Sequence, residues 1–212
     1  MFGLSTIRKL LAGKYLCNSG NYVNKNEIEK AIHSAKMFLK LYPKKENDEN
    51  HKMSAFEHEC FAIAHYNLGA SYAKKGDYNQ GLKEYNAVLC HKENDAEAYN
   101  NIGGIYSLMN DQINAKVNFE KAIKYNENYP EPHVNLARGY YHQGDYIQAI
   151  KDFTFAIKKN NNYEIAYLER AASFIKLEQY NEAINDLYSV LRINPNNKKA
   201  IFNINQLRDK VK

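Results

Sequence analysis

The sequence has no tryptophan and, among its 212 residues, only 4 prolines, 10 glycines and 3 cysteines. Strands joined by tight turns need more turn-forming residues than this, so the composition favours a helical chain. The cysteines Cys17, Cys60 and Cys90 have no CxxC spacing and are odd in number. This argues against a disulfide framework and fits a reducing compartment. No apolar run approaches the roughly 20 residues of a transmembrane helix, so none is expected.

The body of the chain also lacks an excess of positive charge. The net charge is +5, yet residues 1–26 contain four basic residues and no acid, and residues 198–212 contain five basic residues and one acid. The basic character therefore belongs to the two ends. A phosphate chain needs a regular basic lining, so an RNA-binding repeat is the least favoured function and no nucleic acid is expected as a partner.

Four blocks of 34 residues follow one another without a gap, at 62–95, 96–129, 130–163 and 164–197. Each block contains two stretches with helical apolar spacing, which predicts two antiparallel helices per block. Small residues recur at two equivalent positions and allow the helices to approach closely, namely Gly69, Gly103, Ala137 and Ala171, and Gly81, Ala115, Ala149 and Ala183. Large residues are expected to meet beside them, namely Tyr72, Tyr106, Tyr140 and Phe174 with Tyr85, Phe119, Phe153 and Leu187.

The turn between the two helices of a block has its own residue pattern. Gly76 and Gly144 lie where the first helix must end in a left-handed conformation, and Asn110 is the next most tolerant residue there. Glu178 departs from this pattern and predicts a slightly different turn. The next residue in the first three blocks is an aspartate, which predicts N-caps for the second helices at Asp77, Asp111 and Asp145.

This framework of small and aromatic residues resembles the tetratricopeptide repeat family over about two-thirds of the chain. The resemblance implies an all-α fold, a right-handed superhelical α-solenoid of antiparallel helix pairs. The expected divisions are a basic amphipathic segment at 1–14, a degenerate first helix pair at 15–43, a polar insertion loop at 44–53, a repeat with an extended first helix at 54–95, repeats at 96–129, 130–163 and 164–197, and a capping helix at 198–212.

The N-terminal stretch MFGLSTIRKLLAGKY has two interpretations. It contains no acid, includes Ser and Thr, and places Leu4, Ile7, Leu11 and Tyr15 on one stripe, which resembles a mitochondrial transit peptide. The alternative is a helix that packs against the first, degenerate repeat. The expected localisation is accordingly cytoplasmic, with a mitochondrial one as the alternative.

The sequence contains no catalytic signature: a P-loop, a dinucleotide fingerprint and a nucleophile elbow are all missing. His58, Cys60 and His65 lie near one another on one expected helix, but a fourth ligand for a metal has no obvious source. We therefore expect neither an enzyme nor a metal site, and no cofactor.

The better candidate is the inner face of the solenoid, which the first helices of the pairs line. The candidate partner-binding residues on this face are Tyr66, Asn67, Lys74, Glu97, Asn100, Asn101, Glu131, Val134, Asn135, Arg138, Tyr141 and His142. Asn67, Asn101 and Asn135 are equivalent in the repeats and predict a ladder of amides suited to the backbone of an extended peptide. Apolar contact is expected from Tyr66, Val134 and Tyr141.

The resemblance implies an interaction scaffold that binds an extended peptide or a helix of a partner protein in its concave groove. A structural subunit of a large assembly, mitochondrial or not, is one alternative. Another is a chaperone adaptor, since some family members grip acidic C-terminal tails with a carboxylate clamp. Lys14, Asn18 and Asn67 match the start of that clamp, but Glu97 and Asn101 stand where cations are needed, which disfavours it.

Overall fold

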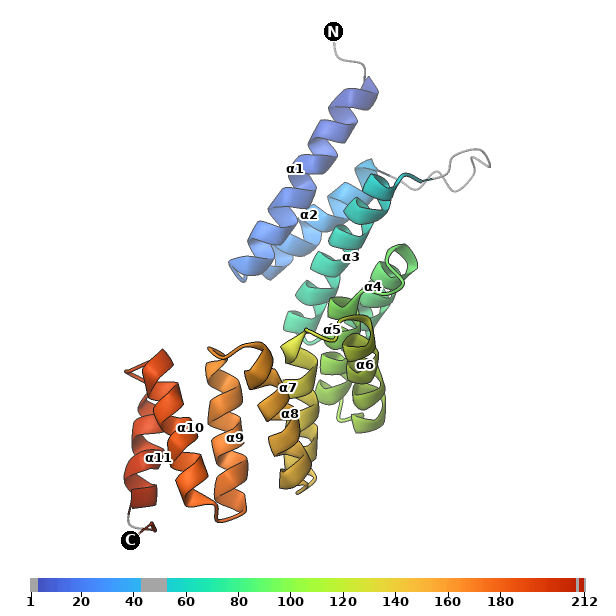
Figure 1. Cartoon of the computed structure of the whole chain (residues 1–212). Coiled ribbons are helices and arrows are strands. Elements are labelled where there is room, and N and C mark those ends of the chain that lie inside the picture. The colour runs from blue at the N-terminus through green and yellow to red at the C-terminus, as the bar shows by residue number, and fades with distance from the viewer. Residues whose placement is uncertain (1–3, 43–52, 209, 212) are drawn as a thin grey trace. The chain divides into compact units, whose positions relative to one another are not determined.

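The computed structural model describes residues 4–42, 53–208 and 210–211, and every regular element in these ranges is an α-helix (Figure 1). The chain divides into two compact units, Met1–Ala115 and Lys116–Lys212. The helices are α1 (Leu4–Asn24), α2 (Ile28–Leu41), α3 (Ala55–Lys75), α4 (Tyr78–His91), α5 (Ala96–Leu108), α6 (Gln112–Tyr125), α7 (Pro130–His142), α8 (Tyr146–Lys159), α9 (Glu164–Lys176), α10 (Tyr180–Ile193) and α11 (Lys198–Arg208).

Within each unit, consecutive helices pack in pairs: α1 with α2, α3 with α4, α7 with α8, and α9 with α10 (Figure 1). The all-α architecture of helix pairs predicted from the repeat is confirmed. The predicted loop at 44–53 lies outside the described residues, except for Met53. None of the helices formed by the described residues combines the length and hydropathy that a membrane-spanning segment requires.

The turns inside the helix pairs all contain a residue with positive φ. Gly76, Asn110 and Gly144 have φ values of 84°, 63° and 85°, which confirms the predicted left-handed conformation. Glu178 has φ of 60°, so the prediction of a different turn in the last repeat was wrong. In each turn, the residue after the one with positive φ donates its backbone N–H to the backbone oxygen of the aromatic residue near the end of the first helix. Gln179 donates in this way to Phe174 at 2.9 Å. This shared hydrogen bond imposes the same turn on a residue without glycine's freedom.

The predicted aspartate caps are also confirmed. The side chains of Asp77, Asp111 and Asp145 accept hydrogen bonds from backbone N–H groups three residues later, at 3.3, 3.1 and 3.0 Å. Ser54 caps α3 and forms a capping box with Glu57, so this helix begins where the sequence places it.

The small residues of α3 and α4 lie where the two helices approach each other. A Cβ atom on Gly69 would stand 3.0 Å from three atoms of the Tyr85 ring, and one on Gly81 would stand 2.9 Å from Ile105 Cδ1. Glycine at both positions thus permits the close approach, since a Cβ atom would require the Tyr85 ring to shift at Gly69 and the flexible end of Ile105 to shift at Gly81. Tyr85 meets Tyr66 edge to face, and Tyr72 packs against the cluster of Ile32, Ala35 and Leu68, so the expected meeting of Tyr72 with Tyr85 stays a prediction.

The core of unit 2 joins the helices α7 to α11. Phe153, Leu187 and Val190 are fully buried, with alanines at the predicted small positions Ala137, Ala149, Ala171 and Ala183. α11 adds Ala200, Ile204 and Leu207 to the same core. Its other face is only partly polar, because Ile201 and Phe202 are 43% and 63% exposed there, so the role of this helix as a solvating cap stays a prediction.

The N-terminal helix shows no boundary at residue 14. α1 continues without a break from Leu4 to Asn24, and Ala12 is buried in one cluster with Phe38 and Phe61. Ala12 therefore packs against the neighbouring helices, and both interpretations of the N-terminal stretch stay predictions. The divisions drawn from the sequence remain predictions.

Candidate protein interaction site

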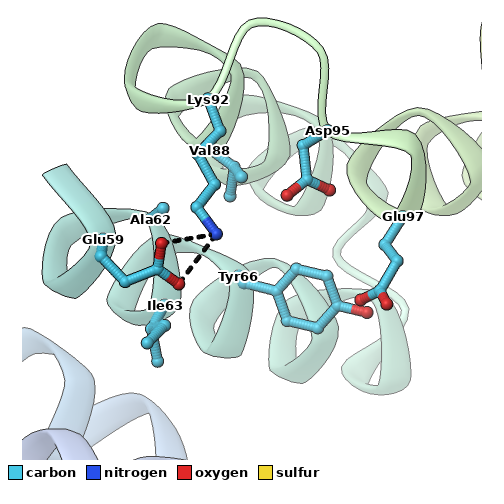
Figure 2. Close-up of a pocket in the computed structure, with 8 residues that line it drawn as sticks. All are labelled: Glu59, Ala62, Ile63, Tyr66, Val88, Lys92, Asp95 and Glu97. Atoms are coloured by element: carbon cyan, nitrogen blue, oxygen red, sulfur yellow. Dashed lines mark hydrogen bonds and ion pairs between the residues drawn. The ribbon is translucent and has the colours of Figure 1, made fainter. Parts of the chain in front are cut away.

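A pocket of about 200 Å³ opens in unit 1 between α3, the end of α4 and the start of α5 (Figure 2). Four different segments contribute to it. The lining residues are Glu59, Ala62, Ile63 and Tyr66 from α3, Val88 from α4, Lys92 and Asp95 from the connection that follows, and Glu97 from α5.

The floor of the pocket is apolar and partly aromatic. Ile63 keeps 39% of its surface exposed, although its neighbours Ala62 and Ala64 are buried. The Tyr66 ring rests edge to face on Tyr85 with centroids 5.4 Å apart, and its hydroxyl accepts a hydrogen bond from Asn101 Nδ2 at 2.9 Å. Burial raises the pKa of Tyr66 against the opposing effect of that hydrogen bond, so the side chain stays a neutral phenol.

The rim of the pocket carries three carboxylates and one ammonium group. Lys92 Nζ pairs with Glu59 at 2.8 Å, and the Asp95 side chain accepts the Ala98 N–H at 2.8 Å as the N-cap of α5. The Glu97 carboxylate makes no ion pair or hydrogen bond within the part of the chain that the structure describes. Figure 2 shows this carboxylate beside the Tyr66 hydroxyl. The rim is therefore net negative, with one carboxylate that the fold does not use.

Of the six candidate residues in unit 1, the structure brings Tyr66, Glu97 and Asn101 together around this pocket. Asn101 Nδ2 donates to both Tyr66 and the backbone oxygen of Glu97, each at 2.9 Å. Lys74 lies elsewhere and donates to the backbone oxygen of Val23 at 3.0 Å. Asn100 is buried, so its side chain offers a partner little surface.

Asn67, the first member of the expected amide ladder, is buried against α1. Its Nδ2 atom donates to Ser19 Oγ at 2.8 Å, and Ser19 has no exposed surface. The prediction that Asn67 contacts a partner was wrong, because this amide joins α3 to α1. Asn101 joins α5 to α3 in the same way through Tyr66. The recurring asparagine thus has a structural role in unit 1.

The six candidates in unit 2 behave differently from one another. Val134 is buried in the core, so its proposed contact with a partner was wrong. Arg138 forms a bidentate ion pair with Glu169, with three N–O distances from 2.7 to 3.0 Å, and also donates to Asn135 Oδ1 at 3.3 Å. Half-buried Tyr141 packs on the Tyr146 ring at 5.3 Å. Of the remaining two candidates, Glu131 is half-buried and His142 is exposed.

The histidines on α3 pair with α4 and do not form a joint site with Cys60. His58 Nδ1 lies 3.1 Å from His91 Nδ1, and His65 Nδ1 lies 2.7 Å from Glu84 Oε2. Across residues 4–42, 53–208 and 210–211, no group of three His, Cys, Asp or Glu side chains has a geometry that could hold a metal ion.

The sequence pattern did not identify Glu59, Lys92 or Asp95 as pocket residues. Glu59 could have been found, because Glu59, Ile63 and Tyr66 follow the same helical stripe at i, i+4 and i+7. Lys92 and Asp95 belong to a connection between helices, and the helical period gives no signal for where such residues point.

A family model described as the tetratricopeptide repeat matches residues 96–129 and 165–197. No curated protein sequence matches the chain. Among solved structures, Pseudomonas aeruginosa pilF is 18% identical with a TM-score of 0.77, over 96% of this chain and 86% of that one.

Two further solved structures of the same fold have peptide-related descriptions. YrrB, described as a TPR protein with an unusual peptide-binding site, is 17% identical with a TM-score of 0.60, over 89% of each chain. The first TPR of Spaghetti (RPAP3), bound to the HSP90 peptide SRMEEVD, is 24% identical with a TM-score of 0.53, over 55% of this chain and 93% of that one. At these identities the similarity establishes the fold alone.

Proposed function

We propose that this chain is a tetratricopeptide repeat protein and a non-enzymatic interaction scaffold that binds an extended segment of a partner protein at the pocket of unit 1. The observation that carries this proposal is the unused binding capacity of the pocket. Ile63 and Glu97 lie side by side with Tyr66 in a concave site, yet the fold needs neither the exposed isoleucine surface nor the Glu97 carboxylate.

The pocket can supply both the affinity and the orientation that such binding requires. A partner side chain would bury apolar surface on Ile63 and Tyr66, at about 25 cal/mol for each Å² removed from water. Asn101 uses its Nδ2 donor within unit 1, while its Oδ1 atom accepts no hydrogen bond within the described residues. That oxygen can accept a backbone N–H of an extended segment.

The comparisons support this proposal through the fold that the chain shares with peptide-binding proteins. YrrB is described with a peptide-binding site, and the Spaghetti domain was solved with an HSP90 peptide. We extend from these only the use of the fold to hold a peptide. On unit 2, the residues Glu131, Asn135, Arg138, Tyr141 and His142 remain proposed contacts, and Arg138 would have to exchange its pair with Glu169 for one with the partner.

Binding of acidic chaperone tails is disfavoured as the form of this activity. Asn67 is buried against Ser19 and cannot serve in a carboxylate clamp, although Lys14 is exposed on α1. Glu97 adds negative charge where a tail carboxylate would have to sit, and like charges in contact oppose binding.

The test compares partners captured from cells by the wild-type chain and by two variants. Ile63→Ser with Asn101→Ala removes apolar surface and an acceptor from the pocket, and we expect it to deplete the captured partners at least severalfold. Ile113→Ser is the matched control, because Ile113 is 80% exposed on α6 and lies outside the pocket. Circular dichroism confirms that both variants fold. Unchanged capture by the double variant would refute the proposal.

The second candidate function is a structural subunit of a larger assembly. Its support is the apolar surface at the α5–α6 turn, where Leu108 and Ile113 are both largely exposed although neither contributes to the core. Under this function, the Ile113→Ser variant loses its partners and the pocket variant keeps them. The same experiment therefore separates the two candidates.

A further inference from the structure

We propose that the pocket of unit 1 holds an arginine side chain of the partner segment, and this inference rests on the proposed function. Two properties of the pocket together indicate arginine. The floor is apolar and aromatic, and the rim has the opposite charge to a guanidinium group. Both properties come from residues that α3 and α5 position independently.

The charges around the pocket select a cation. Glu59 pairs with Lys92 at 2.8 Å, while the Asp95 carboxylate accepts the Ala98 N–H as the N-cap of α5 and has no ion pair within the described residues. Glu97 adds a second carboxylate with no cation beside it in the described residues. A cationic side chain therefore completes the charge balance of this site, and an acidic one would meet two carboxylates.

The floor selects arginine among cationic side chains. The aliphatic stem of an arginine can cover Ala62 and Ile63, since long basic side chains bury their stems on apolar surface. Its planar guanidinium can lie on the Tyr66 ring and pair with Glu97 through two parallel hydrogen bonds. The hydrogen bond from Asn101 holds Tyr66 in position for this stacking. A lysine can pair with Glu97 but cannot stack as a plane on Tyr66.

The experiment titrates the full-length, ¹⁵N-labelled chain with N-acetyl-arginine amide and with its citrulline analogue, which has the same shape without the charge. We expect saturable shifts of the Ile63, Tyr66 and Glu97 amides, with an affinity for the arginine amide roughly fivefold or more above that for the citrulline amide. Glu97→Gln should remove this difference. Glu93→Gln should preserve it, because Glu93 is an exposed acid in the preceding connection and does not line the pocket.

Each alternative result has a separate meaning. Equal affinity for the two amides at the pocket overturns the arginine inference but leaves the pocket as a docking site. Shifts that spread over the surface, or a preference that Glu97→Gln leaves intact, also overturn it. N-acetyl-lysine amide is titrated in the same way, and an affinity equal to that of the arginine amide overturns the selection of arginine by stacking on Tyr66. The proposed function is judged independently, since its capture experiment changes Ile63 and Asn101 and leaves Glu97 in place.

Discussion

The guanidinium of Arg170 on α9 and the carboxylate of Asp186 on α10 form a bidentate ion pair inside unit 2, with N–O distances of 2.8 and 2.7 Å. Their side chains are only 16% and 7% exposed. Arg170 also donates to Thr154 Oγ1 on α8 at 2.7 Å, so one side chain connects three helices.

Breaking this pair by removing one partner should destabilise unit 2 strongly. Arg170→Leu leaves the buried Asp186 carboxylate without its cation, and we expect the free energy of unfolding to fall by about 3 kcal/mol. Denaturant titration followed by circular dichroism measures this free energy of unfolding. The double variant Arg170→Leu with Asp186→Leu should recover much of the loss, because an apolar pair removes the unpaired charge. A single-variant loss below about 1 kcal/mol would contradict this prediction.

Two glycines of unit 1 should respond in opposite directions to alanine. Gly69→Ala would place its Cβ 3.0 Å from the Tyr85 ring, and we expect a net loss of about 1–2 kcal/mol from overpacking. Gly104 has no heavy atom within 4 Å of the corresponding position, so Gly104→Ala should gain roughly 0.5–1 kcal/mol from helix propensity. Thermal unfolding of the two variants compares them directly. A gain in stability from Gly69→Ala would show that the close approach of α3 and α4 is not limiting, and a loss from Gly104→Ala would contradict the prediction for that site.

The left-handed turn of the last repeat offers a route to higher stability. Glu178 adopts φ of 60°, a conformation that is costly for a side chain with a Cβ atom, and Glu178→Gly should raise the free energy of unfolding by about 1 kcal/mol. The reverse change at the equivalent site, Gly144→Ala, should lower it by a similar amount. Chemical denaturation of both variants measures the two changes in the free energy of unfolding. If Glu178→Gly is destabilising, the turn is not strained.

The sequence predicted the features that each repeat specifies locally. The 34-residue period, the close packing at Gly69 and the caps at Asp77 and Asp145 depend on neighbouring residues, and the structure confirms them. The turn at Glu178 was missed because the hydrogen bond from Gln179 to Phe174, and not the intrinsic preference of glutamate, sets its conformation.

The candidate site was predicted less well than the fold, because a helical stripe does not distinguish a residue that faces the next helix from one that faces a partner. The structure brings Tyr66, Glu97 and Asn101 together at one pocket, whereas it buries Val134 in the core, and contact of the first three with a partner stays a prediction. Lys92 joins the site through its ion pair with Glu59, which lies 33 positions away, and no local pattern records such a pair.

Asn67 illustrates that limit and supports a last prediction, because its amide donates to Ser19 Oγ at 2.8 Å across 48 positions of sequence. Asn67→Ala should lower the free energy of unfolding by about 1–2 kcal/mol, since it leaves the buried hydroxyl without this donor. Amide hydrogen exchange should become faster along α1, which this bond connects to α3. Asn86→Ala is the matched control, because Asn86 is exposed and, among the residues that the structure describes, its side chain donates to the Leu82 backbone oxygen of its own helix alone. Unchanged protection of α1 in Asn67→Ala would mean that apolar packing around Ala12, and not this amide, holds the first helix in place.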